Sequence, residues 1–312
     1  MLLLRLIANA LAPLTLAGAV AAYLEPALWL PVKGFFLWLF AATMFALGVV
    51  LQPEELGETL REPKAIALGV ATQYTVMPLV GFAAAYLSGL PEALALGFII
   101  VGCAPGAMAS NVIVYLAGGA VAYSIALTTV ATVLSPLLTP GLVKLLGAAF
   151  VPIPFWPMMW TILTTVLLPL LLGMGARRLA GRHLAVAEAL APAVATLAIV
   201  IICSYAVAAN QGRLASVGAT VFVLVVAVNA AGYLLGWQAA RLFGFERRRR
   251  LTLAIEIGMQ NAGLGVALAL KHFSAETALP GALFAVWCIM TSAGAAGFFR
   301  RAEAARTATV LP

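Results

Sequence analysis

The chain has 312 residues, of which 64% are hydrophobic and only 9% are charged, and its mean hydropathy is +1.07. Because a soluble domain carries about 25% charged residues, this composition excludes a chain that is soluble by itself and indicates a membrane protein. The net charge of +7 does not indicate nucleic-acid binding, because the basic residues lie between apolar stretches and form no basic face.

Apolar runs bounded by proline, glycine and charged residues predict ten membrane spans, since each span needs about 20 residues. The loops between them are too short to form a separate soluble domain. We therefore predict an all-α polytopic membrane protein. The expected limits of the spans are 6–24, 34–52, 64–88, 92–117, 122–147, 157–179, 187–209, 215–243, 249–271 and 278–299.

The lysine and arginine residues fall unequally on the two sides of these spans. With the amino terminus placed in the cytoplasm, 14 basic residues lie on the inner side and 4 on the outer side. Cytoplasmic loops are enriched in lysine and arginine, so this count predicts two cytoplasmic termini and an even number of spans. The four outer residues are Lys33, Lys144, Arg213 and Lys271.

Five spans in each half place the second half in the opposite orientation, as in transporters built from inverted repeats. The two halves are expected at 1–152 and 153–312. Glycine and side-chain amides interrupt the fourth span at 105–111 and the ninth span at 258–263. Irregular backbone survives at membrane depth only where it is buried in protein or lines a cavity, so the two interruptions point to a binding site.

Glu256 is the one glutamate that lies well inside an apolar span. An unpaired carboxylate at that depth costs at least about 2.5 kcal/mol, so it is expected to hold a cation or a proton. The alternative is an ion pair with Arg249, two helical turns earlier on the same face. Sodium, as a hard cation, needs several oxygen ligands. Polar side chains that could supply them are Gln73, Ser110, Asn111, Ser124, Thr128 and Gln260.

Four segments carry a resemblance to a known family. They are Ala-Ser-Asn-Val-Ile-Val-Tyr-Leu-Ala at 109–117, Leu-Ser-Pro-Leu-Leu-Thr-Pro at 134–140, Ala-Ile-Glu-Ile-Gly-Met-Gln-Asn-Ala-Gly-Leu at 254–264 and Pro-Gly-Ala-Leu-Phe-Ala-Val-Trp at 280–287. They resemble bacterial members of the bile acid:sodium symporter family. The resemblance implies ten helices in an inverted five-plus-five repeat, with broken helices 4 and 9 crossing at mid-membrane. It also implies a core domain of helices 3–5 and 8–10 and a panel domain of helices 1, 2, 6 and 7.

The resemblance further implies two sodium sites that share Glu256. The first would use Ser110, Asn111, Ser124, Thr128 and Glu256, and the second would use Gln73, Glu256, Ile257, Met259 and Gln260, partly through backbone carbonyls. Asn261 matches a residue that faces the substrate. The chain departs from the family where a His-Asn pair gives way to Cys288 and Ile289, and where Met108 replaces a small or hydroxyl residue. These three residues are expected to make the substrate wall more apolar.

The leading hypothesis is a sodium-coupled symporter that carries a small or amphipathic organic monoanion by alternating access. Carboxylates, bile-acid-like acids and keto or hydroxy acids fit this description. The protein is expected in the bacterial inner membrane, surrounded by lipid, with no obligatory protein partner and no enzymatic activity. One alternative is sodium-independent efflux of a metalloid through an intramembrane cysteine, with Cys103 or Cys288 as candidates. Another is a membrane sensor that transports nothing.

Overall fold

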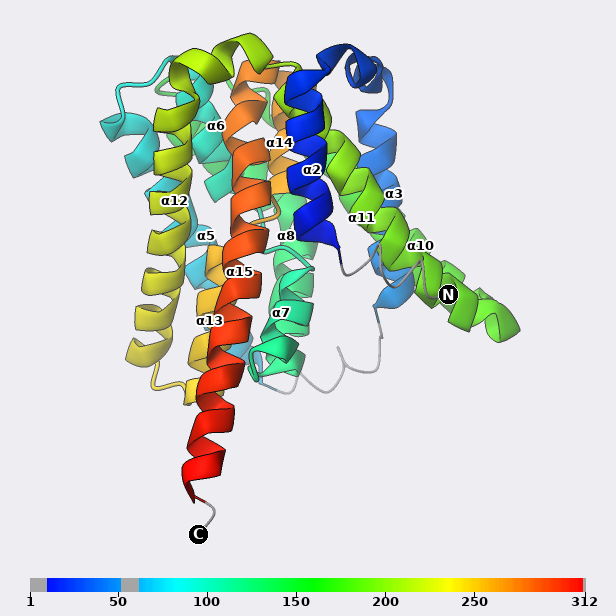
Figure 1. The fold of residues 1–312 in the computed structure, drawn as a ribbon, viewed down its shortest axis with the longest axis vertical. Coiled ribbons are helices and arrows are strands. Elements are labelled where there is room, and N and C mark those ends of the chain that lie inside the picture. The colour runs from blue at the N-terminus through cyan, green and yellow to red at the C-terminus, as the bar shows by residue number, and fades with distance from the viewer. Residues whose placement is uncertain (1–9, 52–61, 311–312) are drawn as a thin grey trace.

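The computed structural model describes residues 10–51 and 62–310, and residues 6–9 of the first predicted span lie outside these ranges. The described residues form thirteen α-helices, joined mostly by short turns, and no named strand. Figure 1 shows the helices arranged as a bundle, with the carboxy-terminal helix running through it and beyond its lower end. An all-α protein is therefore confirmed.

The first half contains six α-helices. Two short 3₁₀ turns, Pro26–Leu28 and Leu30–Gly34, separate the first two, and the chain bends there by 111°. The helices are α2 (Leu11–Leu24), α3 (Phe36–Val50), α5 (Pro63–Leu87), α6 (Glu92–Gly102), α7 (Ser110–Leu116) and α8 (Val121–Gly147). The predicted span 92–117 is thus divided between α6 and α7.

The second half contains seven α-helices. A π-helical segment, Leu163–Leu167, joins the first two into one apolar stretch, and a short 3₁₀ turn, Gly181–His183, follows them. The helices are α9 (Phe155–Ile162), α10 (Leu168–Leu179), α11 (Leu184–Ala208), α12 (Gln211–Leu242), α13 (Arg247–Gly258), α14 (Ala262–His272) and α15 (Ala275–Val310). The span 249–271 is divided between α13 and α14, and the last helix continues to Val310, beyond the predicted end at 299.

Five helical stretches within the described ranges are long and apolar enough to cross a membrane, and a sixth is obtained if the bent pair at the amino end counts as one span. Of the other predicted spans, those at α3, α6–α7 and α13–α14 are short or interrupted. The structure therefore supports a multi-pass membrane protein without establishing ten crossings.

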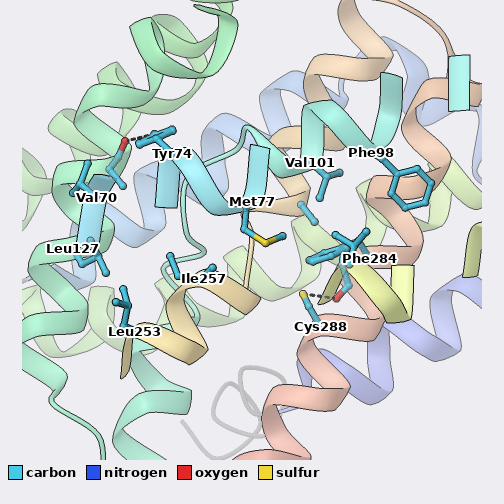
Figure 2. Packing of buried hydrophobic residues seen from close by; sticks show 14 of the residues in the cluster. Val70, Tyr74, Met77, Phe98, Val101, Leu127, Leu253, Ile257, Phe284 and Cys288 are labelled. Atoms are coloured by element: carbon cyan, nitrogen blue, oxygen red, sulfur yellow. Dashed lines mark hydrogen bonds between the residues drawn. The ribbon is translucent and has the colours of Figure 1, made fainter. Parts of the chain in front are cut away.

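The helices pack as two groups. In the first group α3 lies against α10 and α11, and α2 lies against α11; in the second, α5 packs on α6, α12 on α13 and α14 on α15. A buried cluster fills the second group and brings together Val70 of α5, Val101 of α6, Leu253 of α13 and Phe284 of α15 (Figure 2). Each group thus has its own close packing.

A second buried cluster joins the two groups over one part of their boundary. It combines Phe36 and Phe40 of α3 with Ile99 of α6 and Leu264 of α14. Burial of such side chains contributes about 1.5–3 kcal/mol each relative to exposure to water, although lipid would weaken that preference. The groups are therefore closed against each other at this part of the boundary.

Helices α3 and α10 cross at two glycines. A methyl group built on Gly173 would overlap the Phe45 carbonyl oxygen, and one built on Gly48 would overlap the Leu170 carbonyl oxygen. Small residues at such a crossing let two backbones approach closely, which is a common way of packing helices in membranes.

We predict that Gly173→Ala destabilises the protein by about 1–3 kcal/mol, because the added methyl group must push the two backbones apart. Gly175→Ala is the matched control, since nothing lies within 4 Å of the added methyl group two residues further along the same helix. Thermal unfolding in detergent measures both variants. Equal melting temperatures for the two variants would contradict the close crossing.

Candidate functional site

The interruptions of the two broken helices lie against each other. The Ala107 N–H donates to the Met259 carbonyl at 3.0 Å, and the Asn261 N–H donates to the Pro105 carbonyl at 2.8 Å. Gly106 and Gln260 form an antiparallel bridge between these two bonds. The backbone groups released from each helix are therefore satisfied by the other, as buried irregular backbone requires.

Local sequence explains where the breaks fall. Pro105 has no N–H to continue helix α6 and disfavours helical geometry in the residue before it. Met259 takes extended backbone angles, φ −96° and ψ 96°, which ends α13. Asn261 then starts α14 as its N-cap, since its Oδ1 accepts from the Leu264 N–H at 3.1 Å.

Glu256 lies on the last turns of α13, directly beside the interruption, and is only 1% exposed. Its Oε1 accepts hydrogen bonds from Ser110 Oγ at 2.5 Å and from Ser124 Oγ. Within the part of the chain that the structure describes, Oε2 has no hydrogen-bond partner. Oε2 faces Gly106, where a methyl group would lie 3.1 Å from it. One oxygen of this buried carboxylate is thus left open, without a hydrogen-bond donor among the described residues.

The alternative ion pair with Arg249 is not formed. Arg249 instead bonds Glu62 at 2.6 Å, at the end of the bundle where α13 begins. The Arg249 guanidinium holds the pKa of the Glu62 carboxyl below its usual value, through their hydrogen bond first and their opposite charges second. Glu256 therefore has no basic partner from this arginine.

The five residues predicted for the first sodium site lie together. Asn111 Oδ1 accepts from Ser124 Oγ at 2.7 Å and lies 3.4 Å from Thr128 Oγ1. Ser124 has one hydroxyl proton but faces two acceptors, the Asn111 amide oxygen and the Glu256 carboxylate. A cluster with more oxygen acceptors than protons, next to an open carboxylate oxygen, has the chemistry of a cation site.

The residues predicted for the second sodium site are also brought together. Gln73 of α5 donates through Nε2 to the Ala104 carbonyl at 3.0 Å and to Gln260 Oε1 at 2.8 Å. Gln260 in turn donates to the Ile257 carbonyl at 2.7 Å. The Met259 carbonyl accepts from the Ala107 N–H, as described above, and carbonyl oxygens retain a second lone pair. Backbone and side-chain oxygens from three segments therefore meet on this side of the break.

A cavity of about 370 Å³ lies on the other face of the broken helices. All four residues predicted to contact substrate line it: Met108, Asn261, Cys288 and Ile289. Polar groups enter it from Asn111 and Gln260, which also belong to the two oxygen clusters, and from Thr43 and Thr196. No lysine or arginine occurs among the described residues of its wall. The cavity is largely apolar with a few amide and hydroxyl groups at its surface.

The wall of this cavity that lies opposite the breaks could not be identified from the sequence. Helix α3 contributes Phe40, Thr43 and Met44, and α11 contributes Pro192 and Thr196. The signals available were weak, because they consist of a proline and two threonines in otherwise apolar spans. Phe40 and Met44 have no sequence feature that separates them from lipid-facing residues.

Comparison with known proteins gives a consistent set of similarities. Residues 37–235 match the model of the Sodium Bile acid symporter family. The chain is 38% identical over 269 residues to the uncharacterized sodium-dependent transporter YocS of Bacillus subtilis (strain 168), covering 86% of this chain and 84% of that protein. It is 34% identical over 290 residues to the probable sodium/metabolite cotransporter BASS1, chloroplastic, of Oryza sativa subsp. japonica, covering 90% and 71% of the two chains.

The position of the cysteines gives a test of the cavity. All three cysteines are buried, but Cys288 is among the residues that line the cavity, and Cys103 and Cys203 are not. We predict that a small methanethiosulfonate reagent modifies the folded protein at Cys288 and that Cys288→Ser abolishes the adduct. Mass spectrometry of the intact chain counts the adducts. Labelling that persists in Cys288→Ser, or that disappears in Cys103→Ala, would show that the cavity is misplaced.

Proposed function

Because the chain belongs to the Sodium Bile acid symporter family, we propose that it couples sodium entry to the uptake of a small or amphipathic organic monoanion. Sodium-coupled membrane transport is the activity that its relatives share, and the family consists of transporters rather than enzymes. The observation that carries our proposal is the open oxygen of buried Glu256 inside a cluster that is rich in acceptors and poor in protons.

Two sodium ions would bind on either side of Glu256. The first would be held by the side chains of the Ser110 and Ser124 cluster, and the second by the oxygens that gather around Gln73 and Gln260. A second cation beside one carboxylate is favoured where the site also accepts an anion, which balances the charge. The ions are co-substrates that must leave, so weak ligands such as amides and hydroxyls suit them. Sodium binding and substrate binding would then depend on each other.

The two packing groups support a panel domain and a core domain. Helices α2, α3, α9–α10 and α11 would be the panel, and α5 to α8 with α12 to α15 would be the core. In this scheme α6–α7 and α13–α14 are the broken fourth and ninth spans of an inverted repeat whose halves are 1–152 and 153–312. The antiparallel meeting of the two breaks is the arrangement that such a repeat would produce.

The cavity extends toward the end of the bundle where α3 ends and α11 begins, since Leu51 and Ala191 line it. Arginines gather at this end: Arg177 donates to the Val49 carbonyl at 3.0 Å, and Arg248 donates to the Gly118 carbonyl at 3.0 Å. By the positive-inside rule this end would be cytoplasmic, and both termini would then lie on the cytoplasmic side of the inner membrane. The structure would then represent an inward-facing arrangement.

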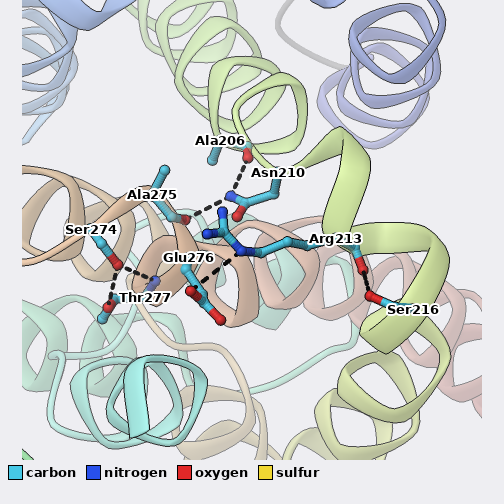
Figure 3. A network of polar contacts seen from close by, with 8 residues as sticks. All are labelled: Ala206, Asn210, Arg213, Ser216, Ser274, Ala275, Glu276 and Thr277. Carbon is cyan, nitrogen blue, oxygen red and sulfur yellow. Dashed lines mark hydrogen bonds and ion pairs between the residues drawn. The ribbon is translucent and has the colours of Figure 1, made fainter. Parts of the chain in front are cut away.

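The opposite end of the bundle is tied across the two groups. Asn210, between α11 and α12, donates to the Ala206 carbonyl of α11 and the Ala275 carbonyl of α15 at 2.7 and 2.6 Å, which joins the two groups (Figure 3). Within the second group, Arg213 of α12 pairs with Glu276 of α15 at 3.3 Å. Together with the apolar cluster around Phe36, these contacts would close the outer path. Alternating access would require them to open while the cytoplasmic side closes.

The shape and polarity of the cavity indicate the class of substrate. The amino-terminal end of α14 lines it through Ala262 and Gly263, and such an end attracts an anion. A single negative charge is expected, because the wall offers no basic side chain to offset a second one. Met108, Cys288 and Ile289 favour a ligand whose remainder is largely hydrocarbon. Keto acids, hydroxy acids and larger hydrophobic carboxylates meet these conditions.

We predict that Glu256→Gln removes sodium binding, because the charge that offsets the cations is lost while the shape of the side chain is kept. Thermal unfolding of the purified protein measures this, with sodium exchanged for potassium at constant ionic strength. Glu62→Gln is the control, since Glu62 is an exposed carboxylate that pairs with Arg249 and should leave the sodium effect intact. A Glu256→Gln protein that is stabilised by the same sodium concentration as the parent chain would refute the ion-site assignment.

We also predict that transport is electrogenic and selects monocarboxylates. Two sodium ions and one monoanion move one net positive charge, so an inside-negative potential should accelerate uptake into proteoliposomes. A panel of radiolabelled mono- and dicarboxylates identifies the preferred class. Preference for dicarboxylates, or uptake that ignores the potential, would contradict this prediction.

The double substitution Cys288→His with Ile289→Asn should shift the substrate preference toward more polar acids.

A further inference from the structure

Asn229 lies near the middle of α12 and reaches the break between α13 and α14 with its side chain. It is 1% exposed, and its Nδ2 donates to the Gly258 carbonyl at 2.9 Å. This carbonyl belongs to the last residue of α13, after which the chain turns to extended geometry at Met259. A carbonyl at the end of a buried helix needs a donor from elsewhere, and α12 supplies it.

The residue that Asn229 holds lies between two proposed sodium ligands. Gly258 is flanked by Ile257 and Met259, whose carbonyls accept from Gln260 Nε2 and from the Ala107 N–H. Glycine restricts its own backbone angles less than any other residue. A rotation of the peptide at Gly258 would therefore turn the neighbouring carbonyls away from a common point. The Asn229 amide opposes that rotation.

The orientation of the Asn229 amide is itself fixed. Its Oδ1 accepts from Thr291 Oγ1 of α15 at 2.9 Å, and the Tyr233 hydroxyl lies 3.4 Å from the same Thr291 oxygen. Because Nδ2 must face the Gly258 carbonyl, the oxygen must face the Thr291 hydroxyl, and no other assignment of the amide satisfies both contacts. A chain of side chains thus connects α15 to the end of α13 through α12.

Close packing holds α12 at a constant distance from the break. A methyl group on Gly232 would lie 3.1 Å from both the Gly258 Cα and the Ile257 carbonyl oxygen. A methyl group on Gly258 would overlap the Tyr233 ring. Helix α12 is unbroken over 32 residues, so it is a stiff support beside a helix that is interrupted. The hydrogen bond from Asn229 is therefore made from a fixed platform.

We propose that Asn229 is a positioning residue for sodium binding, which holds the Gly258 carbonyl so that the Ile257 and Met259 carbonyls converge on one cation. The assignment rests on the proposed function. Thr291 lies one helical turn beyond Cys288, which lines the cavity. The same hydrogen bonds therefore join the sodium-binding backbone to the helix that contacts substrate, and they give α15 a means to sense whether sodium is bound.

The test uses the purified full-length protein with sodium alone as the probe. Thermal unfolding is followed while sodium replaces potassium at constant ionic strength, and the sodium concentration that gives half of the stabilisation is measured. Asn229→Leu keeps the size of the side chain but removes its N–H groups, so this midpoint should rise about tenfold, as for other residues that orient metal ligands. Thr291→Val removes the hydroxyl that donates to the Asn229 amide oxygen, and with it the bonds of that hydroxyl within α15, but it keeps the bond from Asn229 to Gly258, so its midpoint should rise by less.

Tyr74→Phe is the matched control. It removes another buried hydrogen bond between helices, from the Tyr74 hydroxyl to the Ala131 carbonyl at 2.7 Å, and neither of these two residues belongs to the breaks (Figure 2). It should lower the melting temperature equally in sodium and potassium and leave the midpoint unchanged. A purely structural role for Asn229 would give this same result in Asn229→Leu and would overturn the proposal.

The outcomes separate the two levels of inference. If the parent chain is not stabilised by sodium, the proposed function fails before Asn229 is considered. If sodium stabilises the parent chain and Glu256→Gln loses that effect, but Asn229→Leu and Thr291→Val keep the parent midpoint, only the positioning role fails. If Asn229→Leu does not fold, Thr291→Val decides, and a midpoint identical to that of the parent chain overturns the proposal.

Discussion

Two interrupted helices can exist inside an apolar bundle because each satisfies the other's backbone. An unpaired N–H or carbonyl group away from water costs several kcal/mol, and the segments around Pro105 and Met259 expose such groups. The reciprocal bonds between them fix the two breaks in one antiparallel arrangement. That arrangement determines the rest of the site, because Glu256 precedes one break, Ser110 follows the other, and Asn261 begins the helix that leads away from both.

The two broken helices have a different environment on each of their two faces. On one face, Glu256 and the Ser110 and Gln73 clusters present oxygen atoms. On the other face, the broken helices border a largely apolar cavity. Asn111 and Gln260 belong to both faces. In the proposed mechanism an ion and an organic anion can therefore influence each other without direct contact, since a shift of either amide changes both environments.

The polar part of the site could be predicted from the sequence, because a carboxylate or amide inside an apolar span has few explanations. Glu256, Gln73 and Asn111 stood out for that reason, and the structure brings them to the breaks. Asn229 carries the same signal, an amide within a long apolar span, yet its role depends on which helix packs beside it. Only the fold shows that α12 lies against the end of α13.

The apolar part could not be predicted in this way. Phe40 and Met44 line the cavity, but nothing in their sequence separates them from residues that face lipid. The helix ends were predicted within a few residues where spans are continuous, as in α5, α8 and α11. The interruptions and the extension of α15 to Val310 depend on tertiary contacts and on polar surroundings rather than on hydropathy.

The cavity has two walls of different origin. One wall is the broken pair with its amides, and the other is formed by side chains of α3 and α11, none of which belongs to the proposed ion sites. Random substitution can therefore act on the α3 and α11 wall, and change the shape of the ligand that fits, without disturbing the residues that we propose to bind sodium. A lineage built on this plan can diversify its cargo over evolutionary time while its energy source stays the same.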